Sequence, residues 1–259
     1  MKIDQATLET CVQATGTVVA IDVIRAFTTA AFAFAAGVRD VLLAGEVDEA
    51  LALRERFPGS LVMGEVGGRR PEGFDFGNSP SALVGLDLTG RRMIQRTSAG
   101  TQGIVRSAQA DALLAASFVC AGATARYLQR RSPESVTFVV TGAGVYRDGD
   151  EDAACAEYVT ALLRGQAPEA ASYLERVRNS REGQFFTMLG SEFPAGDMDC
   201  CLAVDRFDFA IAESKSITLK VLPYILIGIA IGAIIHGYAL ADFLVNIAGP
   251  DNPFAVLQS

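Results

Sequence analysis

Short apolar runs alternate with helix-like stretches along residues 1–213, and this alternation restricts the fold more than any other feature. Runs rich in Val and Ile predict strands at 17–22, 40–45, 60–65, 92–97, 115–120, 135–141 and 201–205. The stretches between them predict helices at 28–37, 47–57, 81–84, 102–113, 123–131, 152–163 and 167–177. Such alternation is typical of the α/β class, so we expect a mainly parallel sheet with helices on both faces.

Residues 214–259 differ in composition and predict a C-terminal hydrophobic helical segment. No Lys, Arg, Asp or Glu occurs from Val221 to Ala241, and an apolar run of ~18 or more residues is typical of a transmembrane helix. We therefore predict two domains, 1–213 and 214–259, with a candidate transmembrane segment at 221–241. The alternative is a buried helix or hairpin of a soluble core.

The charge balance and the cysteines restrict the partners and the compartment. The formal net charge is −8, which argues against nucleic acid or an anionic membrane surface as the main partner. The five cysteines include no CxxC pair, which indicates reduced thiols in a cytoplasmic protein. Membrane association through residues 221–241 is a further expectation, and assembly into a homo-oligomer is left open.

Histidine is nearly absent, because the only one, His236, lies in the last 46 residues. A Ser-His-Asp triad, a phosphohistidine mechanism and a His-rich zinc site are therefore excluded for residues 1–213. Hydrolytic chemistry in that part must use carboxylates, a cysteine, or a hard metal ion with oxygen ligands.

Acidic residues follow two of the predicted strands, where ligands bind in α/β folds. Asp22 ends the first predicted strand with Arg25 in the next turn, and Glu65 follows the third strand before two glycines. Such carboxylates can bind a metal ion, and the arginine can bind an anion through two hydrogen bonds. The alternatives are a helix-capping Asp, an Arg on a solvated face, and a Glu in an ordinary loop.

The stretch EGFDFGNSP (72–80) places Asp75 between two phenylalanines and ends in a helix-start signal. We expect Phe74 and Phe76 to shield Asp75 from water, which would raise its pKa unless a cation compensates. Ser79 before Pro80 is typical of an N-cap, whose free N–H groups can hold an oxyanion. A cap with two core phenylalanines is the alternative.

Two further strand ends carry polar groups. RTSAGT (96–101) offers an arginine, hydroxyls and backbone N–H groups for a phosphate, although it lacks the ending of a Walker A loop. Glu151 and Asp152 lie where a helix begins, after glycines that come directly behind the strand at 135–141. The alternatives are a polar turn and acids favoured by the helix dipole.

Five motifs of this chain, taken in order, resemble the 2-phosphosulfolactate phosphatase family. They are DVIRA (22–26), GE with two later glycines (64–68), GFDFGNSP (73–80), RTSAGT (96–101) and EDAACAE (151–157). The resemblance covers roughly residues 15–210. It implies a Mg²⁺-dependent phosphoric monoester hydrolase that converts (R)-2-phospho-3-sulfolactate to sulfolactate and phosphate, a step of coenzyme M biosynthesis in methanogens. Ala99 stands where the family usually has Asn, so any contact of that amide is lost.

On this hypothesis the site holds a Mg²⁺ ion and a small anionic phosphoester. The predicted catalytic residues are Asp22, Arg25, Asp75 and Arg96, with the two arginines on phosphate or sulfonate oxygens. The candidate metal ligands, one of which can instead act as general base, are Asp22, Glu65, Asp75, Glu151 and Asp152. The predicted substrate-binding residues are Arg25, Asn78, Ser79, Arg96, Thr97, Ser98, Gly100 and Thr101.

Two alternatives stay open at this stage. Cys120 and Arg126 have the C-x5-R spacing of cysteine-dependent phosphatases, whose thiolate attacks phosphorus. The chain can also be a non-catalytic anion-binding protein tethered to a membrane. The C-terminal ~40 residues, which include ITLKVLPYILIGIAIGAIIHGY, resemble a segment of a permease family that includes arsenical efflux proteins.

Overall fold

The computed structural model describes residues 1–143, 148–188, 193–194 and 196–213, and Met1–Ala212 form one compact unit. The strands are β1 (Lys2–Thr7), β2 (Thr17–Ile21), β3 (Asp40–Leu43), β4 (Leu61–Gly64), β5 (Arg92–Arg96), β6 (Ala112–Ala116), β7 (Ser135–Val140) and β8 (Ile211–Ala212). The α-helices are α1 (Ala26–Ala35), α2 (Val47–Arg56), α3 (Gly100–Arg106), α4 (Ala121–Arg131), α5 (Asp150–Leu163), α6 (Ala170–Asn179), α7 (Arg181–Met188) and α8 (Gly196–Cys201). Three 3-10 turns are η1 (Cys11–Gln13), η2 (Ser81–Leu83) and η3 (Phe118–Cys120).

The strands form two sheets. The larger has the order β1-β7-β2-β6-β8, in which only the short β8 is antiparallel, and the smaller has the order β3-β5-β4 and is parallel throughout. Ile21 at the end of β2 pairs with Ala116 of β6 and Val140 of β7. Because these three strands end level, the residues directly after them meet at one edge, where the acidic residues discussed below lie.

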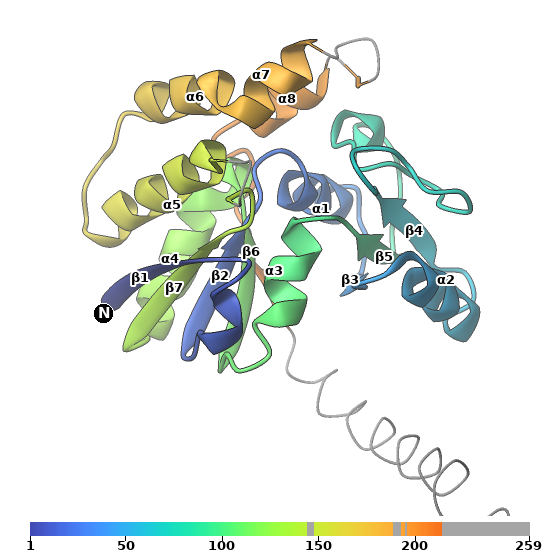
Figure 1. Ribbon diagram of the computed structural model, residues 1–259, viewed down its shortest axis with the longest axis horizontal. Coiled ribbons are helices and arrows are strands. Elements are labelled where there is room, and N and C mark those ends of the chain that lie inside the picture. Colours follow the sequence, from blue (N-terminus) through green and yellow to red (C-terminus); the bar gives the residue numbers. More distant parts are fainter. Residues whose placement is uncertain (144–147, 189–192, 195, 214–259) are drawn as a thin grey trace, which may run out of the picture. The chain divides into compact units, whose positions relative to one another are not determined.

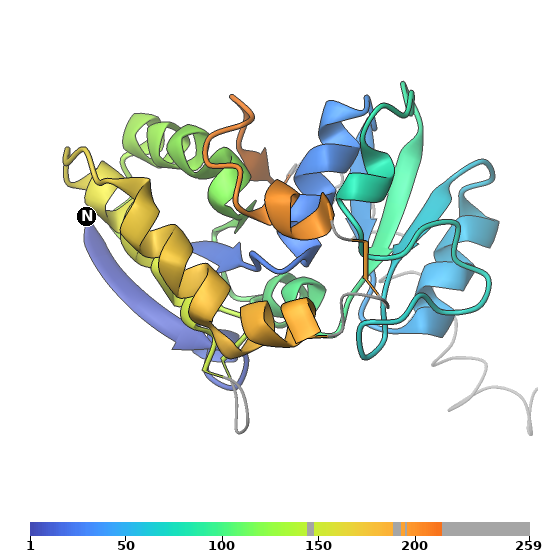
Figure 2. The same ribbon diagram turned by 90° about the horizontal axis from the view of Figure 1, so that it is seen from above.

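The larger sheet is buried on both faces, as its continuous apolar strands require. Side chains alternate along β2, so Val19 and Ile21 join one core with α4 and α5, and Val18 and Ala20 join another. The second core also contains Phe27 of α1 and residues of β4 and β5. Helix α1 therefore packs against both sheets, and it lies between them in Figures 1 and 2.

Helices α6, α7 and α8 come after α5 and form a row above α5 and α1 (Figure 1). Helix α6 packs on α5, and α8 contacts both η2 and η3. Helix α8 thus reaches the connection between β4 and β5, which brings a late part of the chain close to the strand ends.

The structure confirms the predicted class, an α/β fold with mostly parallel strands, although the strands divide between two sheets. The strands predicted at 17–22, 40–45, 60–65, 92–97 and 135–141 are confirmed, with ends that differ by at most two residues. Strand β1 was not predicted, because KIDQAT is a half-exposed edge strand with little apolar content.

Two strand predictions are wrong. The strand expected at 115–120 is β6, which begins at Ala112 and ends at Ala116, and η3 follows it. Because β6 begins this early, the helix expected over 102–113 is shorter and ends at Arg106. The residues at 201–205 begin at the end of α8 and form no strand; Cys201 instead packs against the first core. An apolar run can pack around helices as well as within a sheet, and periodicity alone does not distinguish the two.

Within the described part of the chain, no helix combines the length and apolar character needed to cross a membrane. The segment predicted at 221–241 lies outside the described residues. The predicted membrane helix and the domain 214–259 therefore stay predictions.

Candidate active site

Two carboxylates meet where β2 and β7 end. Asp22 comes directly after β2, and its Oδ1 accepts a hydrogen bond from Ala26 N (2.8 Å), which caps α1. Asp152, in the first turn of α5, accepts one from Val23 N at Oδ1 (2.8 Å). The hydroxyl of Thr141, the residue after β7, lies 3.4 Å from Asp22 Oδ2 and 3.3 Å from Asp152 Oδ2. Two strand ends and one helix start therefore place these acids side by side.

Glu151 is the third member of this acid cluster, which we define as Asp22, Glu151 and Asp152. Its side chain is buried, and its Oε2 has no hydrogen-bond partner among the described residues. A methyl group on Gly142 would lie 2.5 Å from Glu151 Oε1 and 3.1 Å from Asp152 Oδ2. Glycine at this position therefore lets the backbone approach both carboxylates, and its N–H donates to Asp152 Oδ2 (2.7 Å).

Burial and repulsion by neighbouring carboxylates disfavour the charged forms of Glu151 and Asp152. Burial raises the pKa of Glu151 to about 7, and the nearby carboxylates of Glu182 and Asp22 add to the shift. The pKa of Asp152 is raised mainly by burial and also by Glu151 and Asp22. A bound cation would relieve this repulsion.

The acid cluster has the oxygen donors that a hard divalent cation requires. In the described ranges, however, no group of three or more His, Cys, Asp or Glu side chains is already arranged as a metal site. The three carboxylates supply oxygen donors, which Mg²⁺ prefers, and one of these oxygens, Glu151 Oε2, has no hydrogen-bond partner among the described residues. Since Mg²⁺ usually keeps several waters, two or three carboxylates are sufficient.

The loop after β5 packs directly on the acid cluster. Thr97 and Thr101 hold it through reciprocal bonds, from Thr97 N to Thr101 Oγ1 (2.9 Å) and from Thr101 N to Thr97 Oγ1 (3.1 Å). A methyl group on Gly100 would lie 2.7 Å from Asp22 Oδ2 and 2.6 Å from the Cβ of Ala26. The predicted phosphate loop and the predicted metal ligand Asp22 are therefore adjacent.

Glu65 and Arg96 hold this loop from the side of the smaller sheet. The Glu65 carboxylate accepts hydrogen bonds from Ser98 N and Gly68 N, both at 2.6 Å. Arg96 donates to the carbonyl oxygens of Glu65 (2.8 Å) and Gly45 (3.2 Å). Both side chains thus connect neighbouring loops, and the contacts do not bring Glu65 to the acid cluster.

Arg25 directly precedes α1 and comes three residues after Asp22 in the sequence. Its Nη1 lies 2.8 Å from Asp197 Oδ2 of α8 in a buried ion pair. The same carboxylate accepts hydrogen bonds from Ser79 Oγ (2.7 Å) and Ser81 N (3.0 Å). Arg25 and Ser79, which were predicted together as substrate-binding residues, are therefore joined through one aspartate.

Asp75 is exposed, so the expectation that two phenylalanines shield it is wrong. Phe74 packs in a third core with Val62, whereas Phe76 packs against the second core. The carboxylate of Asp75 accepts a hydrogen bond from Val62 N (2.8 Å) at the outer edge of the smaller sheet. Its contacts do not bring it to the acid cluster.

Asn78, in the same stretch, is buried, and its Oδ1 has no hydrogen-bond partner among the described residues. Ser98, another predicted substrate-binding residue, is exposed on the loop after β5.

Comparison with known proteins identifies the family. The family model for 2-phosphosulpholactate phosphatase matches residues 3–215. The chain is 32% identical over 195 residues to a protein of Bacillus subtilis (strain 168), covering 74% of this chain and 85% of that protein. It is 38% identical over 228 residues to a protein of Synechococcus sp. (strain RCC307), covering 78% and 91%. Both relatives are named probable 2-phosphosulfolactate phosphatase.

The chain belongs to the 2-phosphosulfolactate phosphatase family. The predicted enzyme class, a phosphoric monoester hydrolase, is confirmed by this membership. The family match ends at residue 215, so the resemblance of the C-terminal residues to a permease stays a prediction.

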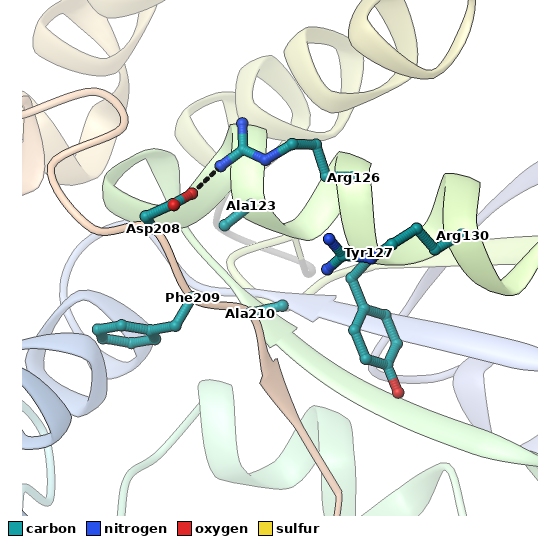
Figure 3. A pocket seen from close by; sticks show the side chains of 7 residues that line it. All are labelled: Ala123, Arg126, Tyr127, Arg130, Asp208, Phe209 and Ala210. Carbon is teal, nitrogen blue, oxygen red and sulfur yellow. Dashed lines mark hydrogen bonds and ion pairs between the residues drawn. The ribbon is translucent and has the colours of Figure 1, made fainter.

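The geometry of this phosphatase family member disfavours cysteine-dependent catalysis. Cys120 is fully buried, and burial raises the pKa of its thiol, which opposes formation of a thiolate nucleophile. Arg126 lies on the outer side of α4 and pairs with Asp208 at a surface pocket (Figure 3). The thiol and the guanidinium therefore do not form a common anion site.

Two groups of site residues were not predicted. Asp197 lies on α8, and Phe186 and Phe193 place their rings 4.9 Å and 4.7 Å from the Arg25 guanidinium. None of the three comes directly after a strand, so the rule that ligands bind at strand ends could not find them. Thr141 does come directly after β7, and that rule could have included it.

We predict that Gly100→Ala disrupts the site, because the new methyl group would overlap Asp22 Oδ2 and Ala26 Cβ. The expected loss of stability is about 1–3 kcal/mol, as for other overpacked sites, with a fall in phosphatase activity of at least about tenfold. Gly45→Ala is the control, since its methyl group would meet its nearest neighbour, Glu49 Oε2, at 3.5 Å. Thermal melting and turnover of both variants test this, and equal behaviour would contradict the packing described.

The raised pKa of Glu151 predicts that the metal-free protein loses stability as the pH rises. Folding raises this pKa from 4.5 to about 7, so its contribution is fully present below about pH 4.5 and is lost as the pH rises through about 7. The whole shift corresponds to about 3 kcal/mol. Glu151→Gln should reduce this pH dependence, which urea denaturation in chelator at about pH 5 and about pH 8 measures. If the difference in unfolding free energy between the two pH values is the same in Glu151→Gln as in the wild type, the raised pKa of Glu151 is wrong.

Proposed function

We propose that the chain is a Mg²⁺-dependent phosphatase that hydrolyses (R)-2-phospho-3-sulfolactate to sulfolactate and phosphate. The observation that carries the proposal is the acid cluster of Asp22, Glu151 and Asp152, which lies against the loop 97–101. Family membership supports the substrate, because both relatives described above carry the name of this phosphatase.

The carboxylates of the acid cluster would hold the cation. Asp22 and Asp152 are oriented by backbone N–H groups, and carboxylate oxygens are the ligand type that Mg²⁺ prefers. Glu151 Oε2, unpartnered among the described residues, is either a further ligand or the base that accepts a proton from the attacking water. When bound, Mg²⁺ supplies positive charge that offsets the charge of the transferring phosphoryl group.

The substrate carries three anionic groups, a phosphate, a sulfonate and a carboxylate, so cationic and hydrogen-bonding groups must compensate for the acidic surroundings. Arg25 and the hydroxyls of Ser79 and Thr97 are the candidates, and the ion pair with Asp197 already fixes the orientation of Arg25. Water would attack phosphorus while the bond to the ester oxygen breaks, which leaves inorganic phosphate and the free hydroxyl of sulfolactate. Arg96 contributes by holding the loop after β5, because its donors reach backbone carbonyls.

We expect the purified full-length chain to release phosphate from 2-phosphosulfolactate in Mg²⁺ and to lose this activity in excess EDTA. Restoring Mg²⁺ should restore turnover, because the acid cluster needs the cation to accept an anionic ester. Phosphate release is measured with a colorimetric assay across sulfonated and carboxylated phosphoesters. Undiminished activity in excess chelator would contradict the metal-dependent mechanism.

The variants Asp152→Asn and Asp75→Asn form a matched pair for this assay. Asp152→Asn removes a charge from the acid cluster and should lower kcat/KM by at least about 100-fold, whereas the exposed Asp75 should be replaceable with little effect. The opposite ranking would place the metal site at the stretch 72–80 and overturn the assignment.

A further inference from the structure

Arg25 is held in a buried environment of unusual composition. Its side chain is 7% exposed, and Nη1 pairs with Asp197 Oδ2 at 2.8 Å. The rings of Phe186 and Phe193 lie 4.9 Å and 4.7 Å from its guanidinium carbon, and the two rings stack on each other at 4.8 Å. An arginine confined in this way has few rotamers left, so its orientation depends on its neighbours.

Asp197 is the group that fixes this orientation from α8. It is fully buried and uses both carboxylate oxygens: Oδ2 pairs with Arg25, and Oδ1 accepts from Ser79 Oγ (2.7 Å), Ser81 Oγ (2.5 Å) and Ser81 N (3.0 Å). One carboxylate therefore ties the start of α1 to the start of η2. These segments come from positions more than 50 residues apart in the sequence.

We propose that Asp197 is a positioning residue, which orients Arg25 and the segment 79–81 for the anionic group of the substrate. This inference rests on the proposed function, because it assumes that Arg25 binds an oxyanion. Nη1 is engaged by Asp197, so the guanidinium can offer its other edge in a fixed direction. A preoriented donor binds the anionic group without a further loss of side-chain freedom on binding.

The contacts of Asp197 argue against two other roles. Its Oδ1 accepts three hydrogen bonds and its Oδ2 pairs with Arg25, all at 2.5–3.0 Å, so neighbours engage both oxygens and disfavour a role as base. It also carries a charge of the same sign as the substrate and is fully buried, so direct contact with the ester would be unfavourable.

The test is a double-mutant cycle on kcat/KM in saturating Mg²⁺, with Asp197→Asn, Arg25→Ala and the combined variant. Asp197→Asn keeps the shape but removes the charge, and we expect kcat/KM to fall about 10- to 100-fold, mostly through KM. In the Arg25→Ala background the same change should have little further effect, because Asp197 acts through Arg25. If Asp197 were purely structural, the fold-losses in kcat/KM of the two single variants would multiply in the combined variant, and this result would overturn the positioning role.

Asp40→Asn is the matched control, since it breaks a partly buried Asp–Arg pair with Arg92 at the amino ends of β3 and β5, away from the site. It should alter the melting temperature and leave kcat/KM within about twofold. If Asp197→Asn does not fold, Ser81→Ala removes one donor to Asp197 and should show a smaller effect with the same coupling to Arg25.

A second readout separates this inference from the proposed function. Calorimetry with inorganic phosphate and Mg²⁺ needs no turnover, and Asp197→Asn should weaken phosphate binding about 10-fold or more. If the wild-type chain binds phosphate in this way but hydrolyses none of the esters, the proposed function fails and the positioning role stands. Phosphate binding that is unchanged or tighter in Asp197→Asn, or absent in the wild-type chain, overturns the positioning role.

Discussion

The site depends on the burial of three carboxylates at one strand edge. Asp22, Glu151 and Asp152 lie where β2 and β7 end, in surroundings that raise the pKa values of Glu151 and Asp152. Backbone N–H groups of Val23, Ala26 and Gly142 compensate part of the cost of burying Asp22 and Asp152. On the proposed function a divalent cation would complete this compensation, and it would connect the stability of the fold to its chemistry.

The two sheets contribute different parts of the site. The larger sheet supplies the acid cluster, and the smaller sheet supplies the loop 97–101, which Glu65 and Arg96 hold in place. Helix α1 packs in the core that both sheets share, so Arg25 and Asp22 lie at their junction. Helix α8 adds Asp197 from a third direction and joins α1 to η2.

Much of this arrangement was predictable from the sequence. Apolar periodicity indicates the strand ends at Asp22 and at Thr141, and level parallel strands bring the residues after them together. Asp75 was misjudged because adjacent phenylalanines need not cover the residue between them; they pack in two separate cores. Asp197 could not be predicted, because its partners are set by where α8 packs, and this depends on tertiary contacts that local patterns do not encode.

The central claim is that the acid cluster binds a divalent cation, and anomalous X-ray scattering from crystals soaked in MnCl₂ tests it most directly. Mn²⁺ takes the same oxygen ligands as Mg²⁺ and can be located by its anomalous signal. The account predicts a peak about 2 Å from carboxylate oxygens of Asp22 and of Glu151 or Asp152. A peak at Asp75 or Glu65 with the acid cluster empty would contradict it.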